Sequence, residues 1–273
     1  MNPAALLRPY GAAFRARWLA MLQYRSAALA GFVTQCWWGG IKVMVLAAFY
    51  AGAPHAGAMP LSQAISYTWT AQGLLTLLPW AGDPEVAQAV RSGAVAYDRL
   101  RPLDTYALWY ARSAGWLAAR VLPRLALMAG FAALLLPLCG ASPWAWQAPA
   151  TAGAALAFLL SALLAWALAT AMVMLLNIAT LAALDARGIN ALATPVVIVL
   201  SGNLLPLALL PDGWQAALLL QPLAGLLDIP LRLYFGQVGT WALGLQLGWL
   251  VLLVVLGRLL LAHSFRALDV QGG

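Results

Sequence analysis

Apolar stretches long enough to cross a lipid bilayer as helices dominate the sequence. Six of them, each of roughly 20 residues, are separated by more polar segments, and this is the length at which a helix spans a hydrocarbon core of about 30 Å. They lie at about 27–50, 61–80, 116–138 (or from 121), 150–178, 189–209 and 241–261. The sequence therefore predicts an all-α polytopic membrane protein with six transmembrane helices.

The charge content excludes the other classes of protein. Hydrophobic residues make up 64% of the 273 residues and charged residues only 8%, whereas a soluble domain carries roughly 25% charged residues. Too few charges are present to cover a soluble particle of this size, so a soluble enzyme, a disordered chain and a fibrous protein are all excluded. In a membrane protein, the net charge of +7 indicates topology and not a nucleic-acid partner.

The segments outside the six spans suggest interfacial structure. Residues 1–25 combine spaced apolar residues with arginines, a pattern typical of an amphipathic helix that lies at the membrane surface. Residues 26–265 form the transmembrane domain, and 266–273 form a C-terminal tail. The apolar stretch 214–227 is too short to span and is punctuated by prolines, which predicts short re-entrant or interfacial helices within about 211–236.

Basic residues are distributed unevenly between the two sides. With the N-terminus inside, thirteen arginines fall on the cytoplasmic side, including those that we place in the second connection at Arg112, Arg120 and Arg124, and only Arg232 falls outside. Positive charge marks cytoplasmic segments. We therefore expect both termini on the cytoplasmic side of the membrane.

No catalytic, metal-binding or nucleotide-binding motif is present in the sequence. The two cysteines have no metal or disulfide spacing, and the two histidines lie in different loops. The only lysine, Lys42, lies inside an apolar run and not at the end of a glycine-rich phosphate loop. We expect no enzyme activity and no cofactor on this chain, so the energy for any active transport would have to come from a partner or an ion gradient.

Polar residues inside the spans are candidates for a transport pathway. A lysine within a membrane span is a functional candidate by default, although Lys42 could also reach the outer interface or bond a neighbouring helix. The second span is unusually polar, and its side chains could line a pore or only join helices. The candidate pathway residues are Gln35, Lys42, Thr68, Gln72 and Asn203.

The connection between the second and third spans predicts a short helix. Pro84 suits a first helical position, Glu85 its first turn, and Gly93 its end. We expect Asp83 and Glu85 to lie in a solvated turn at the start of this helix. A short charged helix facing the cytoplasm could dock onto a cytosolic partner, and the alternative is an ordinary solvated loop.

The order of several motifs resembles the permease subunits of ABC type-2 transporters, within a branch of uncharacterised permeases. The motifs are Ser92-Gly93, Tyr97-Asp98, Leu100-Arg101-Pro102-Leu103-Asp104, Gly202-Asn203-Leu204-Leu205-Pro206-Leu207, Gln221-Pro222, Pro230 with Tyr234-Phe235-Gly236, and Val270-Gln271-Gly272-Gly273. The likeness covers nearly the whole chain, and no single motif is decisive.

The resemblance implies the type-2 exporter fold and the membrane half of an ATP-driven exporter in the inner membrane of a bacterial cell. A coupling helix at about 84–92 would seat on a cytosolic ABC ATPase dimer, which would bind ATP and magnesium. A second permease protomer, identical or paralogous, would complete the pathway within the lipid bilayer. The implied ATPase-coupling residues are Pro84, Glu85, Val86, Arg91, Asp98, Arg99 and Arg101. The alternatives are a secondary carrier or channel that works without ATP, a lipid-modifying intramembrane enzyme, and a scaffold subunit.

Overall fold

A computed structural model describes residues 3–52 and 59–271, and every regular element within them is helical. Four helical stretches are long and apolar enough to cross a membrane. They are α2 (Arg25–Gly52), α6 (Thr105–Gly130) continued by a π-helical turn and α7 (Leu136–Leu138), α8 (Ala152–Ala183) and α12 (Trp241–Gln271). The chain is therefore an all-α membrane protein.

Two further helices lie within the bundle but are shorter. The helix α3 (Leu61–Leu74), with the 3-10 turn η1 (Leu75–Leu77), and α9 (Arg187–Leu200) fall below the length of a full crossing; at a rise of 1.5 Å per residue, α3 is about 21 Å long. Every residue of α3 from Ala64 to Leu74 is buried. Because α3 lies inside the bundle, its polar side chains face other parts of the protein and not lipid.

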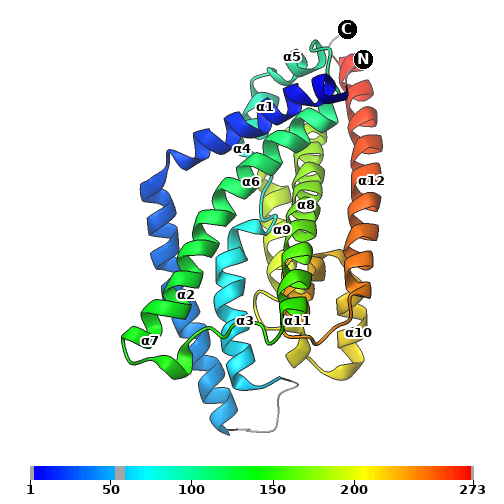
Figure 1. The fold of residues 1–273 in the computed structure, drawn as a ribbon. Coiled ribbons are helices and arrows are strands. Elements are labelled where there is room, and N and C mark those ends of the chain that lie inside the picture. Colours follow the sequence, from blue (N-terminus) through cyan, green and yellow to red (C-terminus); the bar gives the residue numbers. More distant parts are fainter. Residues whose placement is uncertain (1–2, 53–58, 272–273) are drawn as a thin grey trace.

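The first helix, α1 (Pro3–Leu22), crosses one end of the bundle and lies along the first half of α6 (Figure 1). The two backbones approach closely, since a Cβ atom on Gly115 of α6 would lie only 2.5 Å from the carbonyl oxygen of Phe14. This contact fixes α1 as part of the packed structure. Its placement at a membrane surface stays a prediction.

Short helices occupy the two opposite ends of the bundle. Helices α4 (Pro84–Arg91) and α5 (Val95–Arg99) lie at the end that also holds both termini, here called the α4 end. Helices α10 (Asp212–Leu220) and α11 (Asp228–Tyr234), with the 3-10 turn η5 (Pro222–Gly225) between them, lie at the other end (Figure 1). The remaining 3-10 turns are η3 (Ser142–Trp144) and η4 (Leu207–Leu209).

Several predicted boundaries differ from the observed ones. Helix α6 begins at Thr105, where Asp104 caps it by accepting a hydrogen bond from the Ala107 amide at 2.6 Å. Arg112, Arg120 and Arg124 therefore lie inside this helix. The sequence-based prediction that they lie in the second connection is wrong. Helix α9 ends at Leu200 instead of 209, because the chain turns at Gly202 with φ of +83°.

The predicted C-terminal tail, 266–273, is helical as far as it is described, because helix α12 continues without a break to Gln271. Its place in the cytoplasm stays a prediction. Gly272 and Gly273, which close the predicted Gln-Gly-Gly element, and Met1 and Asn2 of the predicted first segment lie outside the described residues.

A buried ion pair holds the turn after α9 against α3 and α11. Asp228 accepts from Arg232 at 2.6 Å, from the Leu207 amide at 3.0 Å and from the Tyr67 hydroxyl at 3.2 Å. Its side chain is fully buried. This network explains why an acid and an arginine can occur within a packed apolar region.

Candidate functional site

Helix α4 is anchored at its first turn by Asp83. The Asp83 carboxylate accepts from the Glu85 amide at 3.0 Å, as an N-cap residue does, and its own amide donates to the Asn177 side chain of α8 at 2.7 Å. Asp83 is only 1% exposed. The prediction of a solvated turn is therefore wrong for Asp83, and holds only for Glu85, which is half exposed.

A chain of ion pairs links α4 to three other helices at the α4 end. Arg17 of α1 pairs with Asp83 at 2.8 Å and also with Glu85. Glu85 in turn pairs with Arg112 of α6 at 3.2 Å, and Arg112 lies 3.6 Å from the Asp98 carboxylate of α5. Displacing α4 would therefore pull on α1, α5 and α6 together.

Burial acts on both partners of the Arg17–Asp83 pair. It raises the pKa of the Asp83 carboxyl above its ordinary value, and the nearby Arg17 guanidinium opposes this rise. Burial also lowers the pKa of Arg17, which Asp83 opposes in turn. Each charge is therefore kept in this position chiefly by the other.

The two faces of α4 differ sharply. Val86 and Val90 are buried among the side chains of Trp109, Met174 and Ile178, which belong to α6 and α8. The opposite face of α4 is exposed and includes Pro84, Gln88 and Arg91. A direct contact of Val86 with another protein is excluded by its burial, so in the predicted coupling helix this residue is a support and not a contact.

The three predicted coupling residues of the α5 region have different environments. Asp98 is buried and accepts from the Trp109 indole at 2.9 Å. The Arg99 guanidinium lies 5.3 Å from the ring of Phe265 in α12. Arg101 is more than half exposed, 3.7 Å from Asp98. Asp98 and Arg99 thus brace α5 against the long helices, and Arg101 is open to solvent.

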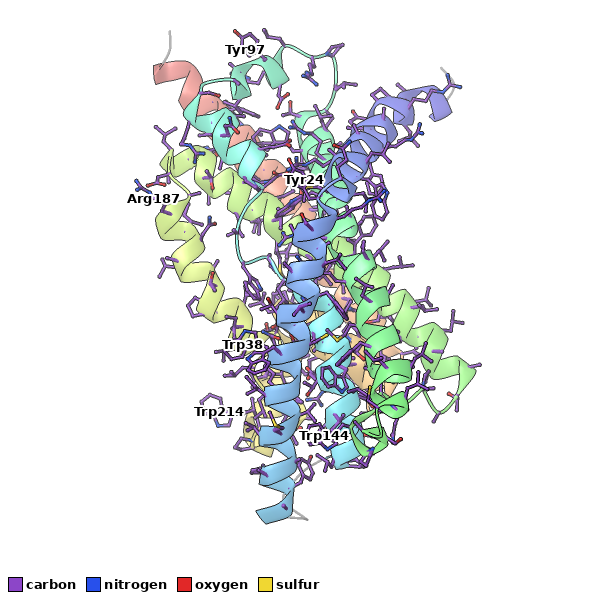
Figure 2. The ribbon with its side chains drawn as sticks, turned by 90° about the vertical axis from the view of Figure 1, so that its left-hand side faces the viewer. Tyr24, Trp38, Tyr97, Trp144, Arg187 and Trp214 are labelled. Carbon is purple, nitrogen blue, oxygen red and sulfur yellow. The ribbon has the colours of Figure 1, made fainter. Side chains whose placement is uncertain are left out.

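Two apolar side chains stand exposed beside α4. Tyr97 is 68% exposed and Leu100 is 79% exposed, and Tyr97 lies at the extreme α4 end of the molecule, far from Trp144 and Trp214 (Figure 2). Sequence reasoning treated both residues only as part of a motif. Their exposure next to charged residues could not have been found from hydropathy.

The predicted pathway residues do not form one group. Lys42 donates to the backbone carbonyl of Asn203 at 2.6 Å, which is the structural hydrogen bond weighed as an alternative for it. Thr68 donates back to the Ala64 carbonyl of its own helix at 2.8 Å. Gln72 is buried against Gly39 of α2. Lys42 and Gln72 thus connect α2 to other segments, whereas the hydrogen bond of Thr68 stays within α3.

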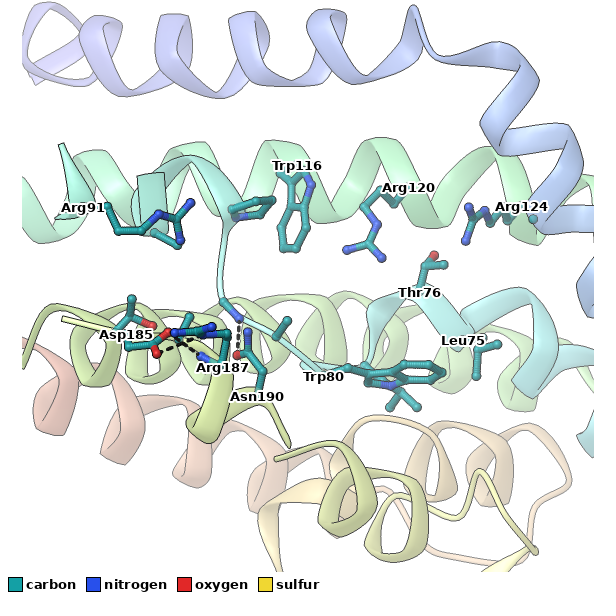
Figure 3. A pocket seen from close by; sticks show the side chains of 18 of the residues that line it. Leu75, Thr76, Trp80, Arg91, Trp116, Arg120, Arg124, Asp185, Arg187 and Asn190 are labelled. Carbon is teal, nitrogen blue, oxygen red and sulfur yellow. Dashed lines mark hydrogen bonds and ion pairs between the residues drawn. The ribbon is translucent and has the colours of Figure 1, made fainter. Parts of the chain in front are cut away.

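Gln35, in contrast, lines a cavity of about 1010 Å³ near the α4 end. The cavity lies between α2, the segment from η1 to α4, α6, the end of α8 and the start of α9. Figure 3 shows Arg91, Trp116, Arg120 and Arg124 in a row along one wall, with Thr76, Trp80, Asp185, Arg187 and Asn190 across from them.

Arg120 and Arg124 are the main residues of the cavity that sequence reasoning missed. In the sequence, their positive charges indicate only which side of the membrane is cytoplasmic. Their spacing of four residues, which places two side chains on one face of a helix, was the available signal.

Comparisons of the chain with sequence models of protein families, with curated proteins and with solved structures give no match. The function proposed below therefore rests on the residues and contacts of this chain.

Proposed function

We propose that the chain is the membrane-spanning permease subunit of an ATP-driven ABC exporter, worked by a separate cytosolic ATPase. In this proposal α2, α3 with η1, α6, α8, α9 and α12 are the six spans, and the α4 end faces the cytoplasm. The motif order in the sequence supports this assignment, and the direction of transport follows from the resemblance alone.

The observation that carries the proposal is the construction of the α4 end. Helix α4 is short, capped by Asp83 and tied by ion pairs to α1 and α6. Exposed apolar side chains lie beside it, at Tyr97 and Leu100. A rigidly held helix next to an exposed aromatic and an aliphatic residue is the kind of surface that a protein partner covers.

Coupling would then be mechanical. ATP binding closes the partner ATPase dimer, and the motion reaches α4 through the exposed face that includes Gln88 and Arg91. The ion pairs from Arg17 and Arg112 to the α4 region pass the motion to the long helices. The translocation pathway that two permease protomers form between them then changes the side of the membrane from which it is accessible. This requires that ATP binding favours one arrangement of the protomers over the other.

Co-purification with an ABC-type ATPase encoded beside the gene tests this proposal. The double variant Tyr97→Ala/Leu100→Ala is expected to weaken the complex by about 30-fold or more, since truncating two central interface residues costs about 2 kcal/mol or more. The matched control is Trp214→Ala/Leu138→Ala, which likewise removes one aromatic side chain and one leucine from exposed positions at the other end.

The same preparations also report on coupling through ATP hydrolysis. The ATPase should hydrolyse ATP at a different rate with the wild-type permease than alone, and the Tyr97→Ala/Leu100→Ala variant should lose this difference. Equal binding by both double variants would contradict the proposed docking surface. Solute movement by the purified chain without any ATPase would favour a secondary carrier or channel instead.

A further inference from the structure

The cavity near the α4 end has a strong excess of positive charge. Four arginines line it, namely Arg91, Arg120, Arg124 and Arg187, together with one acid, Asp185. Asp185 is paired with Arg187 at 3.1 Å. Among the residues that the structure describes, no carboxylate lies within ion-pair distance of Arg120 or Arg124.

Within residues 3–52 and 59–271, the cavity also gathers buried polar atoms for which the structure shows no hydrogen-bond partner. They are Nε2 and Oε1 of Gln35, Oγ1 of Thr76, Nε1 of Trp80 and Nε of Arg124. Gln35 is only 4% exposed and Thr76 only 7%. Buried polar groups are nearly always paired in folded proteins, so these atoms are available as hydrogen-bond partners for a ligand that enters the cavity.

The chemistry of these atoms selects the ligand. Four of the five can donate a hydrogen bond, and the indole of Trp80 and the Nε of Arg124 can only donate. The Arg120 guanidinium is held over the ring of Trp116, 4.5 Å from its centre. Arg124 is fitted against α2, where a Cβ on Gly31 would lie 2.5 Å from its Nη2 atom.

Arg120 and Arg124 are four residues apart on α6, so their like charges repel. An anion between them would turn this repulsion into attraction. A phosphate group offers more acceptor oxygens than a carboxylate and suits the fork of each guanidinium, which leaves oxygens for the neutral donors of Gln35 and Thr76.

Large apolar side chains also line the cavity, namely Leu75, Leu78, Trp80 and Trp116. A cavity of about 1010 Å³ is also larger than a phosphate group alone requires. We propose that this cavity binds a phosphate-bearing amphiphile, with the phosphate between Arg120 and Arg124 and the apolar part against the leucines and tryptophans. The binding site is independent of the proposed function.

Binding to the purified full chain, without any ATPase, tests the site. Phosphatidylglycerol is titrated into the protein in neutral detergent, and bound lipid is counted by native mass spectrometry, with phosphatidylcholine as the zwitterionic reference. A second arm uses inorganic phosphate and glycerol 3-phosphate as soluble competitors. Lipid binding that the soluble compounds do not abolish at equal concentration would support an amphiphile as the ligand. Displacement of the lipid by the soluble compounds at equal concentration would show that the apolar part contributes nothing, and would contradict the proposal.

The variants decide whether the site is the cavity. Arg120→Gln and Arg124→Gln should each weaken binding by about tenfold or more, because each removes a charge-assisted hydrogen bond. The matched control is Arg15→Gln, since Arg15 is an exposed arginine of α1 outside the cavity. Equal effects of all three substitutions, or no preference for anionic lipid, would overturn the proposal.

Gln35→Leu gives a second readout that does not depend on removing a charge. It should raise the thermal stability of the ligand-free protein, because a buried unpaired amide is replaced by an apolar group of similar size, and it should weaken phosphate binding. Unchanged binding in a stable Gln35→Leu protein would contradict the site. Because the phosphate-binding assays contain no ATPase, a loss of phosphate binding says nothing against the proposed coupling. In the same way, a loss of ATPase binding in the co-purification experiment says nothing against the phosphate site.

Discussion

The ion pair between Arg17 and Asp83 is the contact through which α1 holds α4, and its removal should be measurable in a defined way. Both side chains are almost completely buried, at 9% and 1% exposure. Breaking a buried pair by removing one partner typically costs about 3–5 kcal/mol. Arg17 keeps its contact with Glu85, so Asp83→Asn should cost about 3 kcal/mol, at the low end of this range.

Comparison of two substitutions at Asp83 separates the ion pair from the helix cap. Asparagine can still accept the hydrogen bond from the Glu85 amide, whereas alanine cannot, and the lost cap adds about 1 kcal/mol. Asp83→Ala should therefore cost about 4 kcal/mol. The assay is unfolding of the purified protein in detergent, in which 1 kcal/mol corresponds to about 2–4 °C in the melting temperature.

The loss of folding stability caused by the partner substitution Arg17→Met should depend on pH. Without Arg17, the pKa of the Asp83 carboxyl rises further, because burial is then opposed less. A carboxyl whose pKa is higher in the folded state binds more protons when folded, so stability falls as the pH rises from about 4 through the raised value. The cost of Arg17→Met should therefore be smaller at pH 5 than at pH 8.

The double variant Arg17→Met/Asp83→Asn completes the cycle. With both charges gone, its stability should lie within about 1 kcal/mol of the wild type, far from the sum of the single costs. Additive costs, or single variants as stable as the wild type, would refute the view that this pair fixes α4 against α1.

Three further predictions concern packing away from the α4 end or along α1. Asp228→Ala leaves Arg232 buried without its partner and should lower the free energy of unfolding by about 3–5 kcal/mol; an unchanged melting curve would contradict the network. Gly202→Ala should cost about 1–2 kcal/mol because φ is +83° there, and a cost no greater than that of an alanine at Gly11, which has open space around it, would count against this strain. Gly115→Leu should separate α1 from α6, and proteolysis should then cut α1 faster than in the wild type; equal cutting rates would refute the close contact.

Local signals in the sequence were sufficient for α4 but not for the ends of the longer helices. Proline, glutamate and glycine at the right spacing predicted a helix at the positions where α4 is found, from Pro84 to Arg91. The apolar run to 209 predicted too long a helix, because hydropathy does not detect a turn inside apolar sequence. At this turn Gly202 has a positive φ, and its carbonyl accepts a hydrogen bond at 3.1 Å from Tyr67, a residue of a distant segment.

The cavity could not be predicted because its residues come together only in the folded chain. Arg120 and Arg124 are close in sequence, but Gln35 and Thr76 come from other helices. The polar residues of the second span also remained ambiguous in the sequence. Their roles became clear only from contacts such as the Ser66 hydroxyl, which accepts from the Gln147 amide at 2.9 Å.

Photo-crosslinking in living cells tests the central claim most directly. A photoreactive phenylalanine analogue replaces Tyr97 at the α4 end or, in a separate strain, Trp214 at the opposite end, and crosslinked proteins are identified by mass spectrometry. The account predicts that an ABC-type ATPase is crosslinked from position 97 and not from position 214. An ATPase crosslinked from position 214, or none from position 97 while the probe reacts efficiently, would contradict it.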